Sequence, residues 1–219
     1  MPRILFSKTG NAVWISHLDI MRLFQRAFKR SGFHLKHTQG FNPRPSVSIA
    51  LPLSVGVESY CELLDFELED PGITCMEIAE KLNLNLIDGV YVNEVYDEGA
   101  KLKYLKYLQC EIDLDYDNGI PDGAEFSIHG LFKQNELWIE KKSKRGITSQ
   151  NIIPMIHDMS IRKLTDQRLR MSAMISCQEP SLNPSQLYTA IEGYLPQYKP
   201  DFYACRRCEL FNIEKQIFR

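Results

Sequence analysis

The chain has few of the sequence features that mark the large functional classes. It contains no uninterrupted apolar run of about 18 residues, and its opening, MPRILFSKTG, alternates apolar and polar residues. Neither a membrane span nor a secretion signal is therefore expected. A phosphate-binding loop, a dinucleotide-binding glycine pattern, a nucleophile elbow and an H-E-x-x-H zinc motif are all absent. We expect a cytoplasmic protein with no membrane partner, no metal site and no cofactor of its own.

The six cysteines show neither a disulfide framework nor a metal-site spacing. In a chain without an export signal, scattered thiols are more typical of buried core residues. Cys205 and Cys208 stand close together in the order C-R-R-C, but no second pair accompanies them at metal-site spacing. Because residues three apart in a strand point to opposite faces, these two thiols are expected to be structural.

What the sequence does contain is the composition of a folded protein. Apolar residues make up 44% of the 219 and charged residues 25%, which is the ordinary globular range and excludes wholesale disorder. At this length, two compact domains are the commoner arrangement.

The net charge of -2 hides a strong segregation along the chain. Residues 1–60 hold eight Lys and Arg against two Asp and Glu, residues 61–125 hold four against seventeen, and residues 126–219 hold fourteen against nine. The basic opening is suited to a polyanion, and the acidic middle either to a basic partner or to a solvated face. For the middle segment we favour the solvated face.

The first half of the chain predicts a ferredoxin-like domain over residues 1–98. Ser16 with Asp19, and Thr74 with Glu77, have the spacing of capping boxes, so each pair is expected to open a helix. The expected elements are a strand at 3–7, a helix from 17 to about 31, strands at 47–53 and 61–69, a helix ending near 84, and a strand at 90–96. This β-α-β-β-α-β order is that of the split βαβ fold, in which two helices cover one face of a four-stranded sheet.

After a linker at residues 97–104, the sequence predicts a second α+β domain over residues 105–219. Alternating apolar residues favour strands at 108–114, 125–133, 136–142, 167–177 and 202–211. Asn183 as N-cap and Pro184 at the first helical position predict a helix over 184–195. The second domain is expected to be an α+β sandwich, related to the first or a degenerate copy of it.

The helix predicted from residue 17 has one apolar face and one basic face. At 100° per residue, its basic face consists of Arg22, Arg26, Lys29 and Arg30. An ordinary solvated face would have the same appearance. However, no acidic residue lies among these four cations, so they forgo the ion pairs that stabilise exposed helices. A phosphate backbone would relieve their mutual repulsion.

The segment that follows, HLKHTQGFNPRP at 34–45, predicts a stiff loop. Pro43 and Pro45 restrict the backbone, while Gly40 permits a positive φ or a close approach. The loop would add further nucleic-acid contacts, with Phe41 stacking on a base. Alternatively, Phe41 plugs the core of a structural loop. The candidate contacts of the loop are His37, Phe41, Asn42 and Arg44.

The strings SHLDIMRLFQRAFKRSGF and HTQGFNPRPSVSIALPLSVGVESYCELLDFEL closely resemble the radical SAM-linked protein family. Members of this bacterial family are found beside a radical SAM enzyme or fused to its C-terminus. The resemblance covers about residues 1–70. Arg44 stands where the family commonly has another residue, often His, between the two prolines of the loop. That difference argues against a metal ligand at this position.

The resemblance implies an association with a radical SAM enzyme as partner. This chain lacks the C-x3-C-x2-C spacing that such an enzyme needs for its iron-sulfur cluster. The resemblance therefore implies an accessory, substrate-presenting subunit. Whether the chain is an enzyme on its own stays open, and we favour a role without catalysis. The basic helix and loop make RNA, such as tRNA or rRNA, the natural substrate, and a peptide or protein substrate stays open.

Two alternative functions remain at the level of the sequence. His17 with Asp19, near the basic face, could form the catalytic site of a metal-independent, ferredoxin-like endoribonuclease in which His17 deprotonates a 2′-hydroxyl. A histidine that caps or packs at the helix start is the favoured interpretation. The other alternative is a module that binds only protein.

A second basic region lies in the second half of the chain. The run Lys141–Gly146 predicts a basic turn, and Arg168 and Arg170 lie on one face of a predicted strand. Together they would extend a cationic groove across both domains. A solvated hairpin tip is the simpler interpretation of the turn alone.

Overall fold

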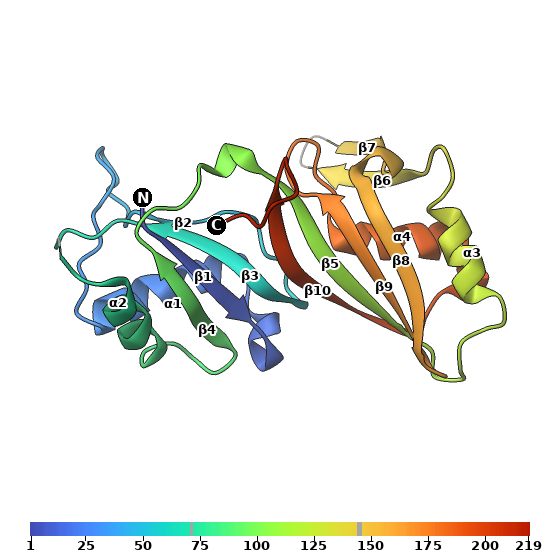
Figure 1. Ribbon diagram of the computed structural model, residues 1–219, viewed down its shortest axis with the longest axis horizontal. Helices are drawn as coiled ribbons and strands as arrows, with labels where there is room; N and C mark the ends of the chain where they lie inside the picture. Colours follow the sequence, from blue (N-terminus) through green and yellow to red (C-terminus); the bar gives the residue numbers. More distant parts are fainter. Residues whose placement is uncertain (71, 144–145) are drawn as a thin grey trace. The chain divides into compact units, whose positions relative to one another are not determined.

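The computed structural model describes residues 1–70, 72–143 and 146–219. The chain divides into two compact units, residues 1–104 with 217–219, and residues 105–216. Both units combine helices with antiparallel strands (Figure 1). The α+β class expected from the sequence is therefore confirmed. None of the helices in these residues is long and apolar enough to cross a bilayer.

The first unit has two helices and four strands in the order β-α-β-β-α-β. Its elements are β1 (Arg3–Lys8), α1 (His17–Arg30), β2 (Val47–Ile49), β3 (Val57–Phe66), α2 (Cys75–Asn83) and β4 (Val90–Tyr96), with short 3-10 turns at Gly10–Trp14 and Leu102–Tyr104. Within the unit the strand order is β4-β1-β3, and β2 pairs with β3. The ferredoxin-like assignment stays a prediction.

Local sequence explains where the two helices of this unit begin. The Ser16 hydroxyl accepts a hydrogen bond from the backbone N–H of Asp19, and Thr74 does the same for Glu77. Each hydroxyl satisfies one of the four N–H groups that a helix start leaves without a partner. The predicted starts of both helices are confirmed.

Both helices pack on the same face of the sheet through aromatic and aliphatic side chains. Phe24 of α1 meets Phe6 of β1 with ring centroids 4.8 Å apart, and Phe28 meets Phe66 of β3 at 5.1 Å. Ile78 and Leu82 of α2 complete the same core. Burying each such side chain contributes roughly 1.5–3 kcal/mol relative to exposure. Because the apolar face of α1 packs on the sheet, the opposite face of this helix is exposed to solvent.

The first unit also contains a buried ion pair. Arg3 donates to both carboxylate oxygens of Asp65, at 2.6 and 3.0 Å, and to the carbonyl of Ala100 at 2.8 Å. Its guanidinium lies 5.4 Å from the ring centroid of Phe218. A Cβ at Gly99 would meet this guanidinium at 2.5 Å, so a larger residue there would have to displace Arg3 from its partners. Residues within the predicted linker are thus anchored to β1.

The second unit consists of a four-stranded antiparallel sheet, a separate hairpin and two helices. Its elements are β5 (Leu105–Asp115), α3 (Ala124–Leu131), β6 (Trp138–Ser143), β7 (Gly146–Asn151), β8 (Ile156–Thr165), β9 (Arg168–Ser176), α4 (Pro184–Tyr194) and β10 (Phe202–Asn212), with 3-10 turns at Ile153–Met155 and Pro196–Tyr198. The strand order is β10-β5-β9-β8, and in the described residues β6 and β7 form a separate two-stranded sheet. The predicted N-cap of α4, Asn183, is confirmed together with a capping box to Gln186. That this unit is a degenerate copy of the first stays a prediction.

Some of the expected strands were wrong or too long, and two of the observed strands were not predicted. Residues 125–133, predicted as a strand, form most of helix α3, because Ala124, Ile128 and Leu131 are buried at helical spacing. The strand predicted at 47–53 ends at Ile49, two residues before the buried Leu51. The prediction also lacked β7 and β8, whose patterns of exposed and half-buried residues give only a weak apolar alternation.

Candidate functional site

The face of α1 that points away from the core is basic. Arg22, Arg26, Lys29 and Arg30 are all exposed, whereas Ile20, Phe24, Ala27 and Phe28 are buried. We call the four cations the α1 basic face. The predicted division of this helix into an apolar and a basic side is thus present in the structure.

The cations of the α1 basic face differ in their partners. Arg22 donates to Asp19 at 2.9 Å, and Arg30 donates to the backbone carbonyl of Asn85. Within the described residues, Arg26 and Lys29 have no hydrogen-bond or ion-pair partner for their side chains. One carboxylate therefore neutralises one end of the face, and the other cations remain available to an anionic ligand.

The proposed catalytic pair, His17 and Asp19, is not brought together. The Asp19 carboxylate accepts a hydrogen bond from the Ser16 hydroxyl at 2.7 Å and from Arg22 at 2.9 Å. These hydrogen bonds hold the pKa of the Asp19 carboxyl below its usual value. His17 is the first residue of α1, and its Nδ1 is buried with no partner in the described part of the chain. Asp19 therefore acts on the helix start and on Arg22 rather than on His17.

The loop at 34–46 forms a narrow two-stranded ribbon. The N–H of Thr38 donates to the carbonyl of Arg44 at 2.8 Å, and the N–H of Arg44 donates to the Thr38 hydroxyl at 3.0 Å. Nearer its base, the N–H of Ser46 donates to the carbonyl of Lys36 at 2.7 Å. Gly40 adopts a φ of 134° at the tip. These bonds give the loop the defined shape that its prolines and glycine predict.

The side chains of this loop divide into a neutralised base and an exposed tip. His34 lies 3.0 Å from Asp70, and Lys36 lies 3.6 Å from Glu67. At the tip, Phe41 is fully exposed, so the expectation that it plugs the core is wrong. His37, Asn42 and Arg44 are also exposed. In the part of the chain that the structure describes, no hydrogen bond or ion pair joins this tip to the α1 basic face.

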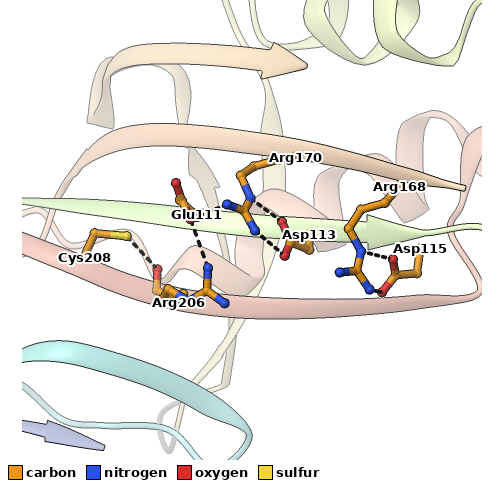
Figure 2. A network of polar contacts seen from close by, with 7 residues as sticks. All are labelled: Glu111, Asp113, Asp115, Arg168, Arg170, Arg206 and Cys208. Carbon is orange, nitrogen blue, oxygen red and sulfur yellow. Dashed lines mark hydrogen bonds and ion pairs between the residues drawn. The ribbon is translucent and has the colours of Figure 1, made fainter. Parts of the chain in front are cut away.

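The second basic region is not a free cationic surface. Arg170 donates to both oxygens of Asp113 at 2.6 and 2.7 Å, and Arg168 pairs in the same way with Asp115 (Figure 2). Oε2 of Glu111 forms ion pairs with Nη1 of Arg170 and with Nη1 of Arg206, each at 3.1 Å. The predicted role of Arg168 and Arg170 in a cationic groove is therefore wrong. Lys144 and Arg145 of the predicted basic turn lie outside the described residues.

The two cysteines of the C-R-R-C sequence lie in environments that suppress thiolate formation. Cys205 is buried and Cys208 half-buried on β10, and burial raises their pKa values to about 12 and about 11. Among the described residues, no three His, Cys, Asp or Glu side chains lie close enough to hold a metal ion.

Two apolar residues beside the α1 basic face were missed by the sequence analysis. Leu18, in the first turn of α1, is 65% exposed, and Trp14, in the preceding 3-10 turn, is 66% exposed. Leu18 precedes Arg22 by four residues, so the two are neighbours on the helix surface. That spacing was visible in the sequence. The exposure of Trp14 was not, because tryptophan is more often largely buried.

These features describe an α+β chain with a basic helix face and a projecting aromatic loop. By sequence, the chain belongs to the family described as "Uncharacterized protein conserved in bacteria (DUF2344)", which it matches over residues 2–184. No curated protein matches the chain.

Solved structures of low similarity also match most of the chain. The crystal structure of a Cbf5-Nop10-Gar1 complex matches with 9% identity and a TM-score of 0.49, over 95% of this chain and 48% of the other. The structure of an H/ACA RNP bound to a substrate RNA containing 2′-deoxyuridine matches with 7% identity and a TM-score of 0.49, over 94% of this chain and 46% of the other. An unknown protein from Galdieria sulphuraria matches with 9% identity and a TM-score of 0.27, over 94% of this chain and 96% of the other. The chain spans about half the length of the first two.

Proposed function

We propose that this protein is a cytoplasmic, RNA-binding accessory subunit that presents RNA to a radical SAM enzyme. The observation that carries the RNA-binding part is the α1 basic face, where Arg26 and Lys29 stand exposed and without partners in the described residues. Phosphate groups are the ligands that such a row of cations favours, because binding relieves their repulsion and releases counterions.

The loop tip is the second part of the proposed interface. Phe41 offers an aromatic ring to an unpaired base, and Arg44 offers a cation beside it. His37 and Asn42 would add hydrogen bonds. The paired base of the ribbon, with Lys36 on Glu67, would position the tip without contributing charge.

The decisive experiment compares two double variants in RNA binding. In Arg26→Glu/Lys29→Glu we expect the affinity for tRNA or rRNA fragments to fall on the order of tenfold or more at moderate salt. The salt dependence should also weaken, because each lost phosphate contact lowers the slope of log K against log salt by about 0.7–0.9. Fluorescence anisotropy at several salt concentrations measures both quantities.

The matched control is Lys101→Glu/Lys133→Glu. It makes the same change in net charge at two exposed lysines away from α1. This variant should bind like the wild type. Equal loss in both double variants would mean that only the overall charge matters, and salt-insensitive binding by the wild type would sink the RNA-binding proposal.

The same samples test the endoribonuclease alternative. If wild-type protein in EDTA leaves 2′,3′-cyclic phosphate ends on RNA and His17→Ala does not, the protein is an enzyme and not an accessory subunit. Intact RNA under these conditions supports the accessory role.

The partnership with a radical SAM enzyme rests on the resemblance of residues 1–70 alone. We expect the tagged protein to co-purify with an iron-sulfur radical SAM enzyme from its native host, identified by mass spectrometry. A complex that survives nuclease would indicate direct protein contact. Failure to recover such an enzyme with or without nuclease would contradict the partnership.

The proposal also includes the domain organisation. We propose that residues 1–98 form a ferredoxin-like domain, which is supported by the β-α-β-β-α-β order and the strand order β4-β1-β3-β2. Residues 105–219 would form the second α+β domain, with the difference that residues 217–219 group with the first unit. Two separate unfolding transitions in scanning calorimetry are expected, and a single transition with equal calorimetric and van't Hoff enthalpies would contradict this.

A further inference from the structure

Trp14 is an exposed aromatic residue at the N-terminal end of the α1 basic face. Only Ile15 separates it from the N-cap Ser16, so its Cα lies within about 8 Å of that of the N-cap. About two thirds of its surface is open to solvent. An exposed tryptophan is costly to leave in water and is enriched where proteins meet partners.

The position of Trp14 is fixed by contacts on both sides of it. A Cβ at position 56 would lie 3.5 Å from Cζ3 of Trp14, so the ring rests against the bare backbone of Gly56. The N–H of Gly56 donates to the carbonyl of Val13 at 2.8 Å. The buried Lys8 donates to the carbonyls of Ile15 and Ser54, at 3.0 and 3.3 Å. These hydrogen bonds hold the backbone on both sides of Trp14 before any ligand arrives, which lowers the entropy lost on binding.

Trp14 lies two residues before the N-cap of α1, and a line of exposed residues along the helix begins four residues after it, at Leu18. Leu18, Arg22, Arg26 and Arg30 follow one another at four-residue steps, and each step rises about 6 Å along the helix. That step is close to the distance between successive phosphates along one nucleic-acid strand. The line thus begins with the apolar Leu18 and continues as Arg22, which is paired with Asp19, and then as Arg26 and Arg30.

This arrangement fits a strand of RNA better than a blunt duplex. Arginines along the helix suit consecutive phosphates, and an aromatic ring suits the face of a base. Within a duplex the bases are already stacked and paired, so only an unpaired nucleotide can turn its face to Trp14. A protein partner with an apolar pocket would occupy Trp14 and Leu18 but would leave the arginines without anions.

We propose that Trp14 stacks on an unpaired base of the RNA whose phosphates lie along the α1 basic face, so that the site selects single-stranded or looped RNA over fully paired RNA. This inference rests on the proposed RNA-binding function and assigns a substrate class to the same site. In this proposal Trp14 and Leu18 belong to the interface, and the RNA strand runs parallel to the axis of α1.

The test uses the full chain with Trp138→Phe, which leaves Trp14 as its only tryptophan. A short single-stranded RNA oligonucleotide and a blunt duplex of the same length are titrated separately. We expect the single strand to quench Trp14 emission and to bind about tenfold more tightly than the duplex, the size of one base–aromatic stack. The duplex should leave the emission unchanged.

Two variants separate stacking from folding. In Trp14→Leu, an apolar side chain still covers Gly56, so the fold is preserved while stacking is lost. We expect this variant to lose the preference for the single strand and to keep the affinity of the wild type for the duplex. Trp14→Phe should keep part of the preference.

The outcomes distinguish this inference from the function on which it rests. If both RNAs bind alike, or the single strand binds without quenching Trp14, the inference is overturned and the α1 basic face still stands. If neither RNA binds, the proposed function falls and the inference with it. If Trp14→Leu binds RNA normally but no longer retains a co-purifying protein, Trp14 is a protein contact and the inference is overturned.

Discussion

The thiol of Cys75 shows how one neighbour controls the chemistry of a side chain. Cys75 opens α2 and donates from Sγ to the Asp97 carboxylate at 3.1 Å. Partial burial, and then the hydrogen bond and negative charge of Asp97, raise the pKa of this thiol to about 11. A helix start usually has the opposite effect and favours the thiolate. Here the carboxylate outweighs it.

Replacing Asp97 should therefore activate Cys75. In the wild type at pH 8 we expect Cys75 to react with iodoacetamide roughly 100-fold more slowly than an unperturbed thiol, because its pKa is raised by about two units. Asp97→Asn removes the negative charge beside the thiol, so the pKa of Cys75 should fall. Labelling of Cys75 should therefore be faster. Peptide mass spectrometry resolves Cys75 from the other cysteines. Labelling of Cys208, also shifted to about 11, serves as the internal control and should not change.

At this scale the sequence predicted what depends on near neighbours. The caps at Ser16, Thr74 and Asn183 were predicted correctly, because a cap needs only residues within one turn. The failure of His17 and Asp19 to meet is also local, since residues two apart on a helix do not face each other. The exposed position of Phe41 was left open, because it depends on ribbon bonds to residues further along the loop.

Strand β5 carries a row of carboxylates that pair with arginines of the neighbouring strands β9 and β10. Asp113 lies opposite Arg170 and Asp115 opposite Arg168 on β9, and Glu111 lies opposite Arg206 on β10. Figure 2 shows the resulting chain of ion pairs across the three strands. Cross-strand pairs of opposite charge stabilise a sheet and fix its register. These charges are therefore structural.

The two bidentate pairs of this row should differ in their contribution to stability. Arg170 and Asp113 expose 18% and 10% of their side chains, whereas Arg168 and Asp115 expose 45% and 25%. Asp113→Ala leaves a mostly buried guanidinium without its bidentate partner and should cost about 2 kcal/mol or more. Asp115→Ala should cost less than about 1 kcal/mol, because water replaces the partner.

Urea unfolding in a Trp14→Phe background would measure this difference. Trp138 on β6 is then the only tryptophan and reports on the second unit. Equal free-energy losses in the two variants would contradict the view that burial decides the contribution of each pair.

At the scale of elements, strong apolar alternation was predictive and weak alternation was not. The strand at 90–96 was predicted at its observed bounds, with Val90, Val92 and Val95 buried. For α3, the apolar residues of AEFSIHGL fit either period, and burial of Ile128 and Leu131 on one helix side decides the outcome. The alternative needed tertiary information that a short apolar run does not contain.

At the scale of the whole chain, folding brings part of the acidic middle segment into contact with the two basic ends. The acidic middle segment was expected to be a solvated face, but several of its carboxylates pair with arginines from the basic ends. Asp65 meets Arg3 across 62 residues, and Asp113 meets Arg170 across 57. Sequence position does not reveal such pairs, because they are set by strand order and register. What remains unpaired in the described residues, notably Arg26 and Lys29, then becomes the informative part of the charge.

The end of the chain contributes to the first unit. Residues 217–219 group with residues 1–104, and the N–H of Ala100 donates to the carbonyl of Arg219 at 2.8 Å. Phe218 is only 2% exposed and lies under the guanidinium of Arg3. The three residues thus cover the buried pair of Arg3 and Asp65. Nothing in the local sequence indicates this, because the contact joins the two ends of the chain.

Phe218→Ala should therefore destabilise the first unit although the substitution lies at residue 218. Removing a buried phenylalanine typically costs 3–5 kcal/mol, and the cavity would also admit water to the Arg3–Asp65 pair. Hydrogen exchange followed by mass spectrometry should show faster exchange in β1 and β3, with β5 and β9 unchanged. Ile217→Ala is the matched control, since Ile217 is 59% exposed, and its exchange should stay close to that of the wild type. If Phe218→Ala instead accelerates exchange only in the second unit, or in neither, the C-terminal residues do not stabilise the first unit.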